Sequence, residues 1–420
     1  MMRIEAITSL LEDGKIDDAM SNFEEVLTSG TDEEKFLLAE ELFRFGFLDE
    51  TKKLLEVLLQ TYPDEGELLV LLAETELELG DEETAMLILE RVNSGDAEYP
   101  QALLLMADLY QMNGLFEVSE QKLLQAKQLL PDETIIDFAL GELYSHQGRF
   151  TDAIESFEKV AQQHKEIGGV NIHSRLAEAY SAGGSFEQAL DYYEKALGER
   201  LEINTLFGFA FTALQAGNNK TAIEKFEELK TLDPEYHSLY LHLAHAYEHE
   251  EMLDEAFEAI KLGIKQDDFN KDLYYYGGKI ALKLNNEEEA EKMLREALVL
   301  DPGFTEGALV LNKLFLKQER YDQVVDLITN TDINEEEEPQ LAWDAAVALQ
   351  NLEQYSQALN KYQHAYTFFK DNKDFLSDYG YFLIEEGKIA EAAEILSILV
   401  KMDPMNVEHQ ELLERLTGEF

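Results

Sequence analysis

A small residue recurs along this chain at an almost constant interval, and that period limits the folds open to it. The recurring places, here called position 20 of each repeat, are Ala19, Thr51, Ala85, Ser119, Ala153, Ala189, Ala222, Ala256, Ala290, Val324, Ala358 and Ala392. The intervals are 32, 34, 34, 34, 36 and 33 residues, followed by five of 34. A sustained period of this length indicates stacked supersecondary units rather than one globular core.

Each repeat is predicted to form two helices joined by a turn. Twelve residues before position 20 the chain usually has a second small residue: Ala39, Ala73, Ala107, Gly141, Ala177, Ala210, Ala244, Gly278, Ala346 and Gly380. Ile7 and Asn312 take that place in the first and tenth repeats. Small residues let two helix axes approach closely where they cross. We expect Phe23, Phe157, Tyr193, Phe226 and Tyr362 to fill the space beside them.

Glycine and proline mark the ends of the predicted helices. A glycine lies five residues before position 20 in eight repeats, at Gly14, Gly46, Gly80, Gly114, Gly148, Gly184, Gly217 and Gly387. At that place it predicts the left-handed residue that ends the first helix. Proline cannot continue a helix. We therefore expect a second helix to end before each of Pro63, Pro131, Pro234, Pro302 and Pro404.

This 34-residue helix–turn–helix pattern resembles the tetratricopeptide repeat (TPR) family. The resemblance implies an all-α, right-handed superhelix (an α-solenoid) of about twelve repeats over residues 1–405, with a polar capping helix at 406–420. The whole acidic, Cys-free chain also resembles the YpiA-type TPR proteins of Bacillus-type bacteria. The repeats are predicted to end near residues 31, 65, 99, 133, 169, 202, 236, 270, 304, 338, 372 and 405.

The charge of the chain restricts its partners. Asp and Glu number 87 against 34 Lys and Arg, which gives a formal net charge of −53. Such a chain repels phosphate backbones and anionic membrane surfaces, so we expect no direct nucleic-acid binding and no membrane insertion. Cys, a signal peptide and a long apolar run are all absent from the sequence, and we expect a cytoplasmic protein.

Resemblance to the TPR family implies that one stripe of each first helix faces a concave groove. At position 9 that stripe is acidic in repeats two to six: Glu40, Glu74, Asp108, Glu142 and Glu178. Apolar groove residues are predicted at Phe36, Phe138, Phe207, Phe211, Tyr275 and Trp343. Together these favour a basic amphipathic partner segment, since such binding needs apolar anchors and complementary charge. Two other interpretations stay open, a solvated face for the acids and packing between first helices for the apolar residues.

Repeats nine and ten carry a basic cluster on the same stripe, at Lys279, Lys283, Lys313 and Lys317. In so acidic a chain it predicts a site for an acidic segment, a C-terminal carboxylate or a phosphate. The alternative is internal neutralisation by Glu287, Glu288 and Glu289. The Lys/Asn/Arg carboxylate clamp of the family's chaperone-binding members is not present in that form, because position 9 is acidic through repeat six.

Three histidines and an acidic run are the remaining candidates. His242, His245 and His249 share one helix face, a spacing at which imidazoles can bind Zn²⁺ or form a pH-sensitive patch. The simpler interpretation is a partly exposed cluster that faces the groove and binds no metal. The run Glu335 to Glu338 precedes a predicted first helix, where carboxylates are favourable.

No nucleophile elbow, P-loop or dinucleotide-binding motif occurs in the sequence. The repeats also leave no room for a separate catalytic domain. We therefore predict a non-enzymatic scaffold or adaptor without a cofactor, whose groove binds segments of other proteins or peptides. Two alternatives remain open: a peptide-sensing TPR regulator, and a metal-binding or enzymatic protein that uses the His242–His249 face.

Overall fold

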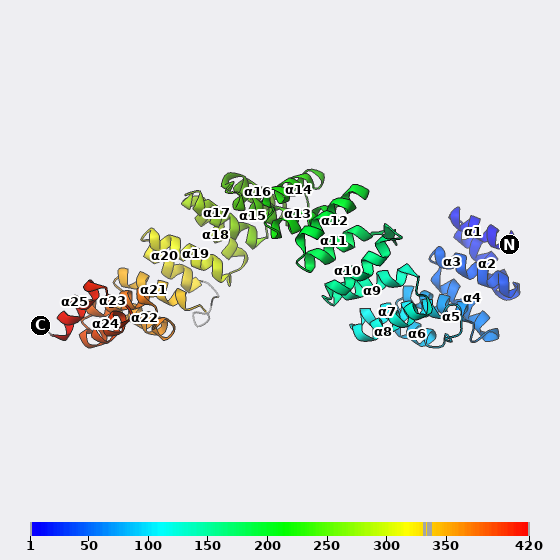
Figure 1. Cartoon of the computed structure of the whole chain (residues 1–420), viewed down its shortest axis with the longest axis horizontal. Coiled ribbons are helices and arrows are strands. Elements are labelled where there is room, and N and C mark those ends of the chain that lie inside the picture. The colour runs from blue at the N-terminus through cyan, green and yellow to red at the C-terminus, as the bar shows by residue number, and fades with distance from the viewer. Residues whose placement is uncertain (1, 331–332, 334–337, 419–420) are drawn as a thin grey trace. The chain divides into compact units, whose positions relative to one another are not determined.

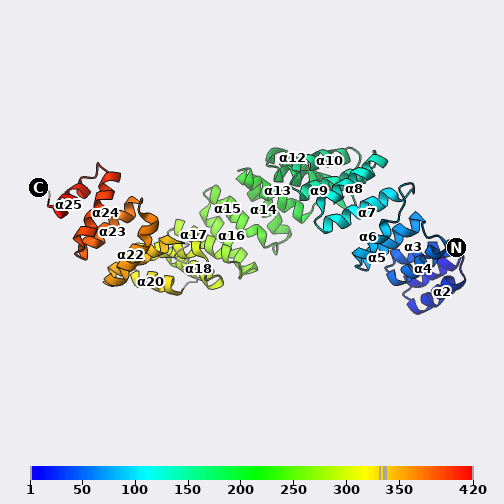
Figure 2. The ribbon, with the colours of Figure 1, turned by 90° about the horizontal axis from the view of Figure 1, so that it is seen from below.

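The computed structural model describes residues 2–330, 333 and 338–418, and these are almost entirely helical (Figure 1). Within that part of the chain there are 25 helices and two short strands. The first 24 helices form twelve consecutive pairs, one pair for each predicted repeat. In both views the two helices of a repeat lie side by side, as α3 and α4 do (Figures 1 and 2).

The odd-numbered helices are the predicted first helices of the repeats. They are α1 (Met2–Glu12), α3 (Asp32–Arg44), α5 (Gly66–Glu78), α7 (Tyr99–Met112), α9 (Thr134–His146), α11 (Ile172–Ala182), α13 (Ile203–Gln215), α15 (Ser238–His249), α17 (Lys271–Lys283), α19 (Thr305–Lys317), α21 (Pro339–Asn351) and α23 (Lys373–Glu385).

The even-numbered helices are the predicted second helices. They are α2 (Ile16–Ser29), α4 (Leu48–Thr61), α6 (Glu82–Leu89), α8 (Phe116–Leu129), α10 (Phe150–Ala161), α12 (Phe186–Glu199), α14 (Asn219–Leu232), α16 (Leu253–Gln266), α18 (Glu287–Leu300), α20 (Tyr321–Asn330), α22 (Tyr355–Phe369) and α24 (Ile389–Met402). All five of the prolines named above follow the end of such a helix. The last helix, α25 (Val407–Thr417), covers the final repeat with Leu412 buried.

The turns between paired helices confirm the predicted left-handed residue. All eight recurring glycines have a positive φ, for example 77° at Gly184. In the four repeats that lack this glycine, the same place still has a left-handed backbone: φ is 60° at Glu251, 58° at Asn285, 57° at Glu319 and 61° at Glu353. The turn geometry therefore belongs to the repeat, and a side chain there costs about 1–2 kcal/mol relative to glycine.

A β-hairpin accounts for the longest interval in the repeat pattern, the 36 residues between Ala153 and Ala189. Strand β1 (Glu166–Ile167) pairs antiparallel with β2 (Val170–Asn171) between α10 and α11. Gly168 and Gly169, with φ of 56° and 83°, form the two-residue loop. Two successive positive φ values are typical of the type I′ turn that matches strand twist.

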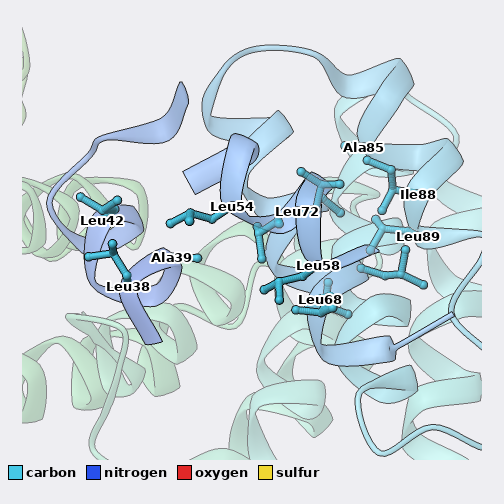
Figure 3. Packing of buried hydrophobic residues seen from close by; sticks show 14 of the residues in the cluster. Leu38, Ala39, Leu42, Leu54, Leu58, Leu68, Leu72, Ala85, Ile88 and Leu89 are labelled. Atoms are coloured by element: carbon cyan, nitrogen blue, oxygen red, sulfur yellow. The ribbon is translucent and has the colours of Figure 1, made fainter. Parts of the chain in front are cut away.

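The chain divides into two compact parts, Met1–Gly208 (the N-terminal part) and Phe209–Phe420 (the C-terminal part). In the N-terminal part the core runs between paired helices and from each repeat to the next. Figure 3 shows Leu38, Leu42 and Leu54 on one side of this core and Ile88 and Leu89 on the other.

The small residues lie at close helix crossings, as predicted. Ala39 and Ala189 are fully buried. A Cβ atom added to Gly141 would lie 2.5 Å from Cε1 of Phe157, closer than real Cβ contacts. At the same place in repeat ten, Asn312 is fully buried as well, and its amide atoms make no hydrogen bond within the described residues.

Three of the four glutamates in the acidic run, Glu335 to Glu337, lie outside the described residues. Glu338 is described and directly precedes α21. No helix in the described part of the chain combines the length and the apolar character that crossing a membrane requires.

Candidate functional site

The four predicted lysines line one open pocket in the C-terminal part. It has a volume of about 410 Å³ and lies between α17, which supplies Lys279 and Lys283, and α19, which supplies Lys313 and Lys317. Successive first helices bring these side chains together because the lysines are one repeat apart. The remaining lining is Leu282, Glu287, Val310 and Leu314, so an apolar floor lies beneath a basic rim.

Two of these lysines are neutralised by carboxylates of the chain. Lys283 forms an ion pair with Glu248 of the preceding repeat, which also accepts a hydrogen bond from Tyr276. Burial raises the pKa of Glu248, but these bonds lower it overall. Lys317 Nζ lies 2.5 Å from Glu287 Oε1, and this bond lowers the pKa of Glu287. The predicted alternative of internal neutralisation therefore holds for Lys317 through Glu287.

The other two lysines have no carboxylate partner among the described residues. Lys279 Nζ lies 5.2 Å from the ring centre of Tyr275 and 5.8 Å from that of Tyr276, within the range of cation–π attraction. Lys313 is exposed to solvent. The pocket thus keeps two positive charges over an apolar floor in a strongly acidic protein.

The three histidines of α15 have different surroundings. The His242 ring centre lies 4.9 Å from that of Phe211, in an edge-to-face arrangement, and His245 lies 4.0 Å from Tyr276. Burial lowers the pKa of both imidazoles, while His249 is exposed. Across residues 2–330, 333 and 338–418, no group of three or more His, Asp or Glu side chains is arranged to hold a metal ion.

The acidic ladder of the N-terminal part is only partly available. Glu142 and Glu178 share Arg175, whose Nε lies 3.1 Å from the first carboxylate and whose Nη1 lies 2.8 Å from the second. Glu74 accepts a hydrogen bond of 2.8 Å from Gln101. Burial raises the pKa of Asp108. The pKa of Glu67 is raised mainly by burial. Repulsion from Glu98 and then from Glu40 raises it further.

The predicted apolar groove residues are all partly buried. Phe36 packs against the core of the N-terminal part, and the Phe138 ring centre lies 6.0 Å from that of Phe157. Phe207 is likewise half-covered. In the C-terminal part, Tyr275 lies edge-to-face on Phe304, the residue that precedes α19, with ring centres 5.0 Å apart. The Tyr275 contact favours the interpretation that these residues pack between successive first helices, whereas Phe138 packs on α10, the second helix of its own repeat.

Trp343 lies outside the lysine pocket. Its indole Nε1 donates a hydrogen bond of 3.0 Å to Asp378, and its ring contacts Phe369 and Phe375 at 5.4 and 5.3 Å between ring centres. All three partners belong to the end of repeat eleven or to repeat twelve, whereas the lysines belong to repeats nine and ten. The contacts of Trp343 are therefore with the C-terminal repeats.

A curated relative decides the family. Over 417 residues the chain is 44% identical to the TPR repeat-containing protein YpiA of Bacillus subtilis (strain 168), covering 99% of each protein. The chain belongs to the YpiA-like tetratricopeptide repeat proteins. Models of the YpiA-like tetratricopeptide repeats match residues 111–165, and the YpiA-like C-terminal repeats match residues 339–406. General tetratricopeptide repeat models match residues 42–109, 172–204 and 272–304.

Two solved structures show a distant similarity to this YpiA-like chain. The crystal structure of YrrB, described as a TPR protein with an unusual peptide-binding site, is 18% identical, with a TM-score of 0.39 over 45% of this chain and 96% of that one. The Cut9–Hcn1 structure is 15% identical, with a TM-score of 0.34 over 98% of this chain and 95% of that one.

The sequence did not reveal Glu248 as the partner of Lys283, nor the floor residues Leu282, Val310 and Leu314. A signal for the first was present, because the two residues are 35 apart, close to one repeat. Side chains at that separation meet when first helices stack. The floor residues alternate with the lysines on α17 and α19, and only the stacking shows that they line the same pocket.

Proposed function

We propose that this YpiA-like protein is a protein-interaction scaffold and that its lysine pocket binds an acidic segment of a partner. Tetratricopeptide repeats typically serve as interaction scaffolds rather than enzymes. The observation that carries the proposal is the pair Lys279 and Lys313, which lack carboxylate partners within the described residues beside an apolar floor. A segment with one apolar side chain between carboxylates complements such a pocket.

A fluorescein-labelled acidic peptide with one central Leu tests this proposal by fluorescence anisotropy. The variant K279E/K313E should weaken binding at least tenfold, because it places carboxylates where the peptide's own carboxylates bind. The control K265E/K401E makes the same change in net charge at exposed lysines of α16 and α24 outside the pocket. Equal affinity of the two variants would contradict the proposal. An amidated peptide would show whether the C-terminal carboxylate contributes.

A second binding site is proposed on the acidic ladder of the N-terminal part, for a basic segment. The supporting observation is that Glu40 and Glu74 have no Lys or Arg partner among the ion pairs of the described residues. E40K/E74K should weaken the binding of a Lys-rich peptide and leave the acidic peptide unaffected. If that variant lost binding of both the Lys-rich and the acidic peptide, it would instead indicate misfolding, which circular dichroism would detect.

A further inference from the structure

The edge between repeats three and four carries an apolar pocket unlike the sites described above. It has a volume of about 410 Å³ and is lined by α6, the end of α7 and Leu115 at the start of α8. Its apolar lining includes Met86, Leu87, Leu109 and Tyr110. The side chains of Leu87 and Leu115 are 60% and 50% exposed, so the apolar surface is open to solvent.

Leu87 departs from the pattern of the repeat. It lies two residues after position 20, and in all the other repeats that place holds Ser, Lys, Gln, Glu, Asp or Asn. In repeat four, Met112 lies seven residues before position 20, where the other repeats have a polar or charged residue or Ala. Met112 is 69% exposed and precedes Asn113, which lines the pocket. Two solvent-facing places have therefore become apolar in adjacent repeats, and large exposed apolar surface marks interaction sites.

The acidic rim of this pocket indicates what kind of partner it binds. Its rim holds Glu82 and Glu83, and no Lys or Arg lines it. Glu82 accepts only a long hydrogen bond of 3.3 Å from Asn113 among the described residues. A second copy of the chain is itself strongly acidic, with a net charge of −53, and is not complementary to this rim. The complementary partner carries apolar side chains flanked by Lys or Arg.

We propose that the apolar surface formed by Met86, Leu87, Leu109, Tyr110 and Leu115, next to the exposed Met112 that precedes the lining residue Asn113, docks a basic amphipathic helix of another protein. The apolar face of the helix covers the exposed Leu87 and Leu115 and extends toward Met112, and its basic residues lie against Glu82 and Glu83. In this arrangement a helix binds in a groove next to the turn between α7 and α8. The site shares no residue with the lysine pocket or the acidic ladder, so its test does not depend on the proposed function.

The probe is a labelled 18-residue Leu/Lys peptide with all leucines on one helical face, and its scrambled form has the same charge but no apolar face. The variant L87Q/M112Q places Gln, which repeat four carries as Gln121 at the first place and repeat seven as Gln215 at the second. Because these places are exposed and other repeats have Gln there, the fold should be retained. The matched control is V299Q, since Val299 in α18 is 73% exposed.

By anisotropy at physiological salt, the amphipathic peptide should bind at least tenfold tighter than the scrambled peptide. L87Q/M112Q should remove that preference, and V299Q should keep it. E82Q/E83Q should weaken binding of the amphipathic peptide and reduce its salt dependence. Equal affinity of L87Q/M112Q and wild type for the amphipathic peptide would overturn the proposal. So would a wild-type dimer in sedimentation that L87Q/M112Q abolishes, because the surface would then bind a second copy.

Discussion

Replacing Asp344 with Asn should stabilise the C-terminal part at neutral pH, by an amount that grows as the pH rises. Asp344 lies in α21 with only 7% of its surface exposed. Its carboxylate accepts one hydrogen bond, of 2.9 Å, from Gln340. The amide of Asn312 faces it without reaching hydrogen-bond geometry. Burial, and to a smaller extent the charge of Glu338, raises the pKa of Asp344 to about 6.

The size of the effect follows from the two protonation equilibria. An unfolded Asp has a pKa of about 3.9, and one pKa unit corresponds to about 1.4 kcal/mol. The folded state therefore holds the proton more tightly, and stability is lost as the pH rises from about 4 through about 6. The total loss is about 3 kcal/mol, of which about 1.4 kcal/mol falls between pH 5 and pH 8. Asn has no such loss and can still accept the bond from Gln340.

Urea unfolding followed by tryptophan fluorescence measures this difference locally. Trp343 is the only Trp of the chain and adjoins Asp344, and its ring packs on Phe369 and Phe375. The free energy of unfolding of D344N relative to wild type should increase by about 1.4 kcal/mol from pH 5 to pH 8. D326N, at an exposed Asp in α20, should show no such change. A constant difference between D344N and wild type would refute the reasoning, since Asp344 would then titrate alike in both states.

Three further predictions concern the repeat itself. In urea titration, G141A should destabilise the N-terminal part by about 1–3 kcal/mol, because the new Cβ would meet buried Phe157. G380A should be nearly neutral, because its Cβ would lie at an ordinary contact distance of 3.4 Å from Leu396. E353G should stabilise the C-terminal part by about 1 kcal/mol by relieving its left-handed backbone, and a destabilised variant would show that the Glu353 side chain contributes more than the backbone costs. The melting temperature should rise from low salt to about 0.15 M NaCl, because screening weakens repulsion within a chain of net charge −53; a flat or falling melting temperature would exclude strong self-repulsion.

The fold could be predicted from the sequence because small residues recur where two helices cross and glycine recurs where the chain turns. Gly184 marks a turn with a left-handed backbone and Ala189 marks a buried helix crossing, and the structure has both there. The left-handed residues Glu251 and Glu353 could not be predicted from their identity, since Glu has no preference for that backbone. Only their distance from position 20 indicates the turn. The hairpin at Gly168 likewise left only a two-residue lengthening of one interval as its trace.

The site was less accessible to sequence reasoning. The grouping of Lys279 and Lys313 follows from the period, because one repeat separates them. Which lysines are already neutralised depends on side-chain reach, and Glu248 reaches Lys283 from the preceding repeat. Trp343 occupies a predicted groove position, yet Asp378 and the phenylalanines of the following helices hold its ring. The position of a residue in the repeat predicts which face of the helix its side chain occupies. Contacts with neighbouring side chains determine how much of that side chain a partner can reach.

The β1–β2 hairpin also offers a place where the chain can be lengthened. Its loop residues Gly168 and Gly169 are exposed, while Arg200 at the end of α12 holds the hairpin through Glu166 and the carbonyl of Gly169. The two extra residues of this interval are absorbed without loss of α10 or α11. Exposed turns of this kind tolerate insertions. An affinity tag or a fluorescent label between Gly168 and Gly169 should therefore leave the neighbouring helices paired and give a handle for partner capture at the middle of the array.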